Sequence, residues 1–168
     1  LPVSAAYRLA GAQADIVHVN DILHERISIF DYQVLNFPGG FSFGDDLGAG
    51  KVLANKIHYR KQTSGQALFR DLTRFVEQGG FVLGICNGFQ ALVKMGLLPN
   101  IGGTYEQEVT LTVNDSGRFE DRWCTLKKTG GEQSPFLEGV TQFDVPVRHK
   151  EGKLVCRDDS IREQLVAK

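Results

Sequence analysis

The sequence has few cysteines, and none of them lies in a pattern that holds a metal or a disulfide framework. Cys86, Cys124 and Cys156 are far apart in the 168 residues, with no Cys-x-x-Cys pair and no Cys/His pair at zinc spacing. An odd, scattered set is typical of reduced thiols in a cytosolic protein. The sequence therefore predicts a cytoplasmic location and no metal site.

Long apolar runs and an excess of one charge are also missing. No run approaches the roughly 18 residues of a membrane span, and no charged-then-apolar signal segment opens the chain. Nineteen Lys and Arg against twenty Asp and Glu give a net charge of −1, which argues against a basic nucleic-acid surface. We therefore expect neither a membrane nor a nucleic acid as a partner.

The first half of the chain alternates helical and strand patterns. Helices are predicted over 1–12, 49–60, 66–78 and 88–96, and strands over 14–19, 31–37 and 81–85. Short connections between strand and helix are typical of an open α/β sheet. The wholly apolar strand 81–85 is of the kind that a doubly covered parallel sheet uses.

The second half is predicted to be β-rich, so a wholly parallel sheet is not expected there. Strand patterns occur at 107–113, 122–128 and 143–148, and 158–168 is compatible with a short helix. We find no internal repeat, low-complexity tract or linker. The sequence therefore predicts a single domain over 1–168.

The segment Gly84-Ile85-Cys86-Asn87-Gly88 places a cysteine between a buried strand and a helix. Glycines two before and two after leave room for the sharp turn of a nucleophile elbow, in which Cys86 takes a strained backbone conformation. At the helix N-terminus the unpaired amides and the helix dipole stabilise a thiolate, which is the reactive form. The alternative is a buried structural cysteine.

A second strand runs into the glycine pair Gly39-Gly40. Two such loops are expected at the carboxyl edge of one sheet, where open α/β folds bind ligands. Amides of the Gly-Gly turn, together with the amide of Asn87, could donate to a tetrahedral oxyanion. An ordinary turn is the alternative interpretation.

These motifs resemble those of a known family. The stretch GICNGFQ at 84–90 fits the G-x-C-x-G-x-Q signature of class I glutamine amidotransferases. The resemblance to the glutaminase subunits or domains of phosphoribosylformylglycinamidine synthases is more specific, and it runs through almost the whole chain. It rests on the strings FPGGFSFGDDLGAG, LGICNGFQALVKMGLLP, TLTVNDSGRFEDRW and SPFLEGVTQFDVPVRHKEGKLV.

The resemblance implies a glutaminase. Cys86 would attack the carboxamide of glutamine, form a γ-glutamyl thioester and release ammonia, while Gly40 and Asn87 would supply the oxyanion amides. It implies further substrate-binding residues: Gly39, Phe41, Gln90, Asn114, Ser116 and His149.

The resemblance also implies a fold and partners. The fold would be an open flavodoxin-like, mostly parallel sheet flanked by helices, with a β-rich second half. The ammonia would pass to a synthetase subunit of purine biosynthesis, with a small third subunit as a further candidate. ATP and magnesium would belong to the synthetase, and no cofactor is expected in this chain. Released ammonia must be kept from water, so a protein interface is needed.

The sequence departs from the family pattern at both ends. The family opens with a strand and ends with an H-P-E segment that carries its catalytic His and Glu, and we expect this chain to lack both. His149 and Glu151, two apart, could form a substitute dyad if they lie on one strand, because both would then face the same side. A loop histidine lining the substrate pocket is the preferred interpretation.

Two other functions remain open on the sequence: a cysteine hydrolase of related scaffold, and a non-catalytic interaction module on the same fold. Gln90 and the string NDSGRFEDRW at 114–123 argue against the first. Asp45-Asp46 is interpreted as a solvated loop rather than a metal pair, and Trp123 as a packing or interface anchor.

Overall fold

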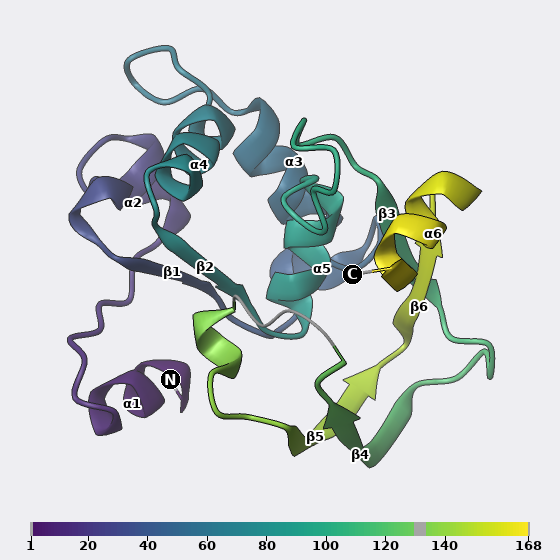
Figure 1. Ribbon diagram of the computed structural model, residues 1–168. Coiled ribbons are helices and arrows are strands. Elements are labelled where there is room, and N and C mark those ends of the chain that lie inside the picture. The colour runs from purple at the N-terminus through teal and green to yellow at the C-terminus, as the bar shows by residue number, and fades with distance from the viewer. Residues whose placement is uncertain (1, 130–133, 168) are drawn as a thin grey trace. The chain divides into compact units, whose positions relative to one another are not determined.

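The computed structural model describes residues 2–129 and 134–167 and has a mixed α/β fold (Figure 1). The chain forms two compact units, one ending at Met95 and the other beginning at Gly96. Within the described residues the strands form three two-stranded sheets, one in the first unit and two in the second. Each unit is described separately below.

The first unit carries the helices of the expected α/β half. Its elements are α1 (Pro2–Leu9), α2 (Val19–Leu23), the 3-10 turn η1 (Ile29–Asp31), β1 (Val34–Phe37), the 3-10 turn η2 (Ser42–Asp45), α3 (Lys51–Tyr59), α4 (Leu68–Glu77), β2 (Phe81–Gly84) and α5 (Asn87–Lys94).

Strands β1 and β2 pair in parallel, with Val34 opposite Phe81 and Phe37 opposite Gly84. Because the strands are parallel and in this register, both end at the same edge. The loops that follow them therefore emerge side by side, which is the arrangement that the sequence predicted for the two glycine-containing segments.

Helices α4 and α5 supply half of the buried apolar residues found in the described part of this unit. Apolar side chains of α4 recur at helical spacing and are buried on one face, which confirms the amphipathic helix predicted there. Helix α5 is buried almost all round at its centre. The buried apolar residues of these two helices are Leu68, Leu72, Phe75, Ala91, Leu92 and Val93.

The prediction of a strand over 14–19 is wrong. Residues 12–17 have no regular secondary structure, and α2 begins at Val19, where the His18 ring nitrogen Nδ1 accepts a 3.2 Å hydrogen bond from the Asn20 amide. A strand needs a neighbouring backbone for its hydrogen bonds. Within the described residues 14–19 has no paired strand, so its alternating pattern alone does not produce one.

The second unit is β-rich, as expected, and its strand pairs are antiparallel. Its elements are β3 (Val109–Val113), β4 (Glu120–Lys127), the 3-10 turn η3 (Pro135–Leu137), β5 (Gln142–His149), β6 (Glu151–Cys156) and α6 (Asp159–Ala167). β4 pairs with β5, and β3 pairs with β6. Strand β6, which the sequence pattern does not predict, follows β5 after one residue and enters the other sheet.

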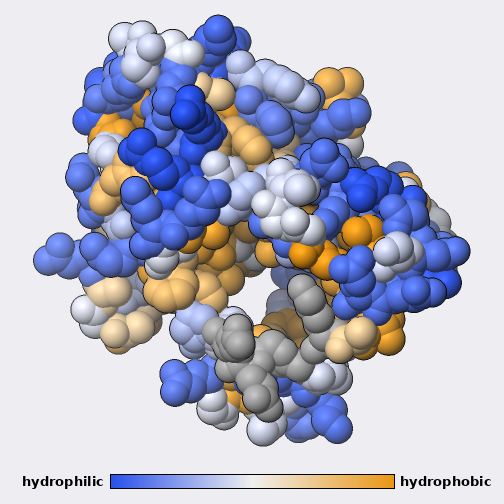
Figure 2. Space-filling view, turned by 45° about the horizontal axis from the view of Figure 1, so that its top comes forward, coloured by the Kyte–Doolittle hydropathy of each residue, from blue (hydrophilic) through white to orange (hydrophobic). Residues whose placement is uncertain are grey.

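Polar residues cover much of the surface seen in Figure 2, with apolar patches between them. Large apolar side chains that are exposed include Phe41, Leu47 and Trp123. A search of the described residues finds no helix that is both long and apolar enough to span a membrane.

Candidate active site

Cys86 lies at the turn between β2 and α5, with φ 52° and ψ −111°. A non-glycine residue rarely adopts a positive φ, and such strain persists only where neighbouring contacts enforce it. Here the Ile85 amide donates to the Phe37 carbonyl and the Gly88 amide to the Ile85 carbonyl, each at 2.9 Å. The thiol is exposed at the start of the helix. This is the strand–turn–helix geometry that the sequence predicted.

The two flanking glycines are required by close packing. A methyl group at Gly88 would lie 2.0 Å from the carbonyl oxygen of Phe37, at the end of β1. A methyl group at Gly84 would lie 2.6 Å from a side-chain carbon of Leu92. Only glycine lets α5 begin this close to the sheet edge, and that approach brings Cys86 to the loop that follows β1.

That loop contacts the elbow directly. A methyl group at Gly39 would lie 3.2 Å from Cβ of Cys86, and Gly40 has φ +145°, which side chains rarely adopt. Phe41, next in the chain, is 76% exposed. Gly39 thus lies against Cys86, and Gly40 and Phe41 follow it in the same loop, for which the sequence analysis expected oxyanion and substrate contacts.

The side chain of Asn87 joins this loop to the helix. Asn87 is only 2% exposed. Its Nδ2 donates to both carboxylate oxygens of Asp45, at 3.0 and 2.9 Å, and its Oδ1 accepts from the Ser42 amide at 3.1 Å. The interpretation of Asp45 as a solvated loop residue is therefore wrong, because its carboxylate is held between the loop and the elbow.

Gln90 lies behind the elbow, on the next turn of α5. It is 6% exposed, and its Oε1 accepts a 3.3 Å hydrogen bond from Nδ2 of Asn87. Gln90 is thus in contact with the residue that follows the candidate nucleophile.

The other predicted residues come together in the second unit. Oδ1 of Asn114 lies 3.0 Å from Nδ1 of His149 and accepts from the Gly152 amide at 3.1 Å. The Ser116 hydroxyl donates to Glu120, and this bond is the main cause that lowers the pKa of Glu120. Asn114, Ser116 and His149 line one open cavity of about 340 Å³.

The substitute dyad does not have the geometry expected of it. His149 is the last residue of β5 and Glu151 the first of β6, so the two lie on different strands in different sheets. The hydrogen bond found at the His149 ring joins it to Asn114. Trp123, on β4, is 72% exposed and does not pack into a core.

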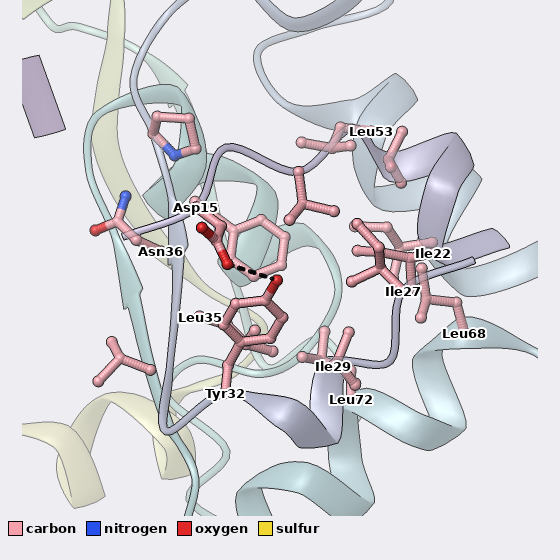
Figure 3. Close-up of a pocket in the computed structure, with 16 residues that line it drawn as sticks. Asp15, Ile22, Ile27, Ile29, Tyr32, Leu35, Asn36, Leu53, Leu68 and Leu72 are labelled. Carbon is pink, nitrogen blue, oxygen red and sulfur yellow. Dashed lines mark hydrogen bonds between the residues drawn. The ribbon is translucent and has the colours of Figure 1, made fainter. Parts of the chain in front are cut away.

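A separate cavity of about 270 Å³ lies in the first unit, beside β1 (Figure 3). Its wall is largely apolar, with Tyr32 donating a 3.2 Å hydrogen bond to Asp15. Desolvation first, and then this bond, raises the pKa of Tyr32. Cys86 is not part of its lining, so it is distinct from the candidate active site.

Nothing in the described ranges brings three or more His, Cys, Asp or Glu side chains together as a metal would require. Asp45 is bonded to Asn87 and to the Gly50 amide, so its oxygens are already used by protein donors. The arrangement at Cys86 suits nucleophilic attack by a thiol, with main-chain amides nearby to receive a developing negative charge.

Known proteins that are similar to this chain are glutamine amidotransferases, in agreement with the resemblance of its sequence motifs. Residues 2–168 match the family described as "CobB/CobQ-like glutamine amidotransferase domain". The chain is 44% identical, over 97% of its length, to phosphoribosylformylglycinamidine synthase subunit PurQ of Dehalococcoides mccartyi. It is 38% identical, over 94% of its length, to the subunit of the same name from Methanococcus maripaludis.

A solved structure is also similar. The "Structure of PurLQS from Thermotoga maritima" matches 83% of this chain, with a TM-score of 0.61 and 27% sequence identity. The match covers 63% of the chain in that structure. Against the two curated relatives, this chain spans 61% and 56% of their length.

Proposed function

Because this chain belongs to the CobB/CobQ-like glutamine amidotransferase domain family, we propose that it is the glutaminase component of a phosphoribosylformylglycinamidine synthase in purine biosynthesis. The observation that carries the proposal is the backbone of Cys86. Its positive φ lifts an exposed thiol to the start of α5, against the Gly39-Gly40 turn. A structural cysteine has no need of that strain.

The proposed reaction is the hydrolysis of glutamine through a thioester. The Cys86 thiolate attacks the carboxamide carbon, and the carbonyl electron pair moves to the oxygen, where the amides of Gly40 and Asn87 donate. Collapse of this intermediate breaks the carbon–nitrogen bond, and the nitrogen takes up a proton, equivalent to the one that the Cys86 thiol lost on forming the thiolate, and leaves as ammonia. Water then cleaves the γ-glutamyl thioester, which gives glutamate and restores the thiol.

The remaining residues are assigned to binding. Gly39 and Phe41 belong to the loop that meets the elbow, and Gln90 is assigned to holding the substrate, with a hydrogen bond to Asn87. From the second unit, the proposal adds three residues of the cavity described above: Asn114, Ser116 and His149.

The proposed partner is a synthetase subunit that receives the ammonia, with a small third subunit in the same complex. ATP and magnesium are assigned to the synthetase, and none to this chain. The similar Thermotoga maritima structure, named PurLQS, supports an assembly of this kind. Exposed Phe41, Phe43 and Leu47 beside the elbow also support a protein interface there. The proposed site of action is the cytoplasm.

We also propose that residues 1–168 belong to one open flavodoxin-like domain. In such a sheet a further strand would run along the edge of β1 that faces away from β2. The apolar cavity beside β1 supports this arrangement. So does Nδ2 of Asn36, on β1, which is buried without a hydrogen-bond partner in the part of the protein that the structure describes.

The test uses the full-length protein in complex with its synthetase subunit. Glutamine-dependent product formation is compared with ammonia-dependent formation in the wild type, Cys86→Ala and, as a control, Cys124→Ala. We expect Cys86→Ala to lose only the glutamine-dependent rate, because added ammonia bypasses the thioester. A Cys86→Ala complex that still uses glutamine would contradict the proposal. A wild type that releases no ammonia from glutamine would favour the interaction module or a different hydrolase.

A further inference from the structure

Asp45 is the residue through which the loop after β1 is fixed to the elbow. Its Oδ1 accepts from the Gly50 amide at 3.0 Å and from Nδ2 of Asn87 at 3.0 Å. Its Oδ2 accepts from the same Asn87 nitrogen at 2.9 Å. One carboxylate thus joins Gly50, at the end of its own loop, to Asn87, the first residue of α5.

The bonded segment carries unusual backbone strain. Phe43 and Asp45 have φ of 56° and 54°, and Cys86, on the other side of the contact, has φ of 52°. Three non-glycine residues with positive φ cluster at one contact. Strain of this kind is maintained only by surrounding bonds, and it concentrates at sites where geometry matters for function.

The same contact links the two proposed oxyanion donors. The Gly40 amide belongs to the loop, and the Asn87 amide belongs to the start of α5. The Asn87 side chain bonds to the loop at Ser42 and Asp45. The distance between the two amides therefore depends on whether that side chain is held.

We propose that Asp45 is a positioning residue for the glutaminase reaction: its carboxylate fixes the Asn87 side chain, and so sets the spacing of the Gly40 and Asn87 amides at the oxyanion. This inference rests on the proposed function. In this role Asp45 acts on the oxyanion donors through Asn87 and the loop and does not itself bind the substrate. It acts by keeping the two donors in place before the substrate arrives, so that no reorganisation is needed during the reaction.

The neighbouring carboxylate supplies a matched control. Asp46 is exposed, whereas Asp45 is half-buried. The two residues have the same charge and lie in the same loop, but only Asp45 bonds to Asn87. An effect of general negative charge near the thiol would appear in both variants, and an effect of positioning would appear only at Asp45.

The experiment measures glutamine hydrolysis by the full-length protein with its synthetase subunit, for Asp45→Ala, Asp45→Asn and Asp46→Ala. We expect Asp45→Ala to lower kcat about 10- to 100-fold with KM for glutamine nearly unchanged, because misplaced donors weaken only transition-state binding. Asp45→Asn keeps one acceptor oxygen and is expected to lose less. Asp46→Ala is expected to match the wild type.

A second measurement separates positioning from damage to the fold. Alkylation of Cys86 by iodoacetamide is a displacement that forms no oxyanion, so its rate is expected to stay within about 2-fold of wild type in both Asp45 variants. Equal losses in alkylation and hydrolysis would instead indicate a disrupted elbow and would overturn the inference.

The side chains of Asp45 and Asn87 can also be exchanged. Asn87→Asp alone sets two carboxylates against each other and should lower kcat more than Asp45→Asn does. The double variant Asp45→Asn/Asn87→Asp restores one donor facing one carboxylate. Its kcat should be at least about 3-fold higher than that of Asn87→Asp alone, because the effects of coupled residues are not additive in a double-mutant cycle. Strict additivity would overturn the inference.

The outcomes also distinguish this inference from the proposed function. One outcome is that Cys86→Ala loses hydrolysis while Asp45→Ala and Asp46→Ala hydrolyse glutamine as fast as the wild type. That result overturns the role of Asp45 and leaves the glutaminase function in place. Failure of the wild type to hydrolyse glutamine overturns both.

Discussion

Gly88 faces the carbonyl oxygen of Phe37 so closely that a methyl group on Gly88 would lie 2.0 Å from it. This approach seats the first turn of α5 on the end of β1. This contact brings Cys86, whose backbone is strained and whose thiol is exposed, next to the Gly-Gly turn that follows the neighbouring strand. The geometry of the candidate active site therefore depends on a residue that has no side chain.

Gly88→Ala is expected to destabilise the protein by about 3 kcal/mol, because the methyl group must push apart two backbone segments. Urea unfolding measures the change. Gly102→Ala serves as the control: its methyl group would lie 3.2 Å from one side-chain atom, Oε1 of Glu108, and would not meet a backbone segment. A Gly88→Ala protein as stable as Gly102→Ala would contradict the packing described here.

The strain at Cys86 can be measured without any substrate. Glycine tolerates positive φ, so Cys86→Gly should be more stable than Cys86→Ala by about 1 kcal/mol. At Cys156, on β6, the order should be reversed, because glycine weakens a strand. Thermal unfolding of the four variants measures both differences in stability between glycine and alanine, one at position 86 and one at position 156. If Cys86→Gly unfolded at a lower temperature than Cys86→Ala, the backbone at the elbow would not be strained.

Asn114 holds the turn after β3 to the junction of β5 and β6. Its side chain bonds to the carbonyls of Arg118 and His149, the His149 ring and the Gly152 amide. We expect Asn114→Ala to cost about 2 kcal/mol in unfolding free energy, since several partners lose their bond at once. Asp115→Ala removes only an exposed ion pair with Lys153 and should cost less than about 0.5 kcal/mol.

We propose that His149, which lines a cavity of the second unit, contacts the substrate. In the full-length protein with its synthetase subunit, His149→Ala should raise KM for glutamine more than it lowers kcat, because a binding contact is lost from both ground and transition states. Lys150→Ala is the neighbouring control. If His149→Ala instead abolished kcat with KM unchanged, His149 would be the general base and the assignment would be wrong.

The elbow could be predicted because its signals are local. Gly84, Cys86 and Gly88 stand at fixed offsets between an apolar strand and a helix, and each step of that pattern depends on near neighbours in sequence. The helices α3, α4 and α5 were identified for the same reason, since helical periodicity is a property of one segment.

The errors arose where structure depends on distant partners. Residues 14–19 alternate like a strand but pair with none in the described residues, and β6 was missed although it pairs with β3. Asp45 was misread because its partner Asn87 lies 42 positions away in sequence. A pair of aspartates in a glycine-rich loop gives no local sign of that contact.

The most direct test of the account is affinity labelling of the full-length protein with a glutamine-like chloroketone, followed by digestion and mass spectrometry of the three cysteine-containing peptides. The elbow geometry predicts a label on Cys86 alone, with protection by added glutamine. A label on Cys124 or Cys156, or a label on Cys86 that glutamine does not prevent, would contradict the claim that Cys86 is the nucleophile of a glutaminase.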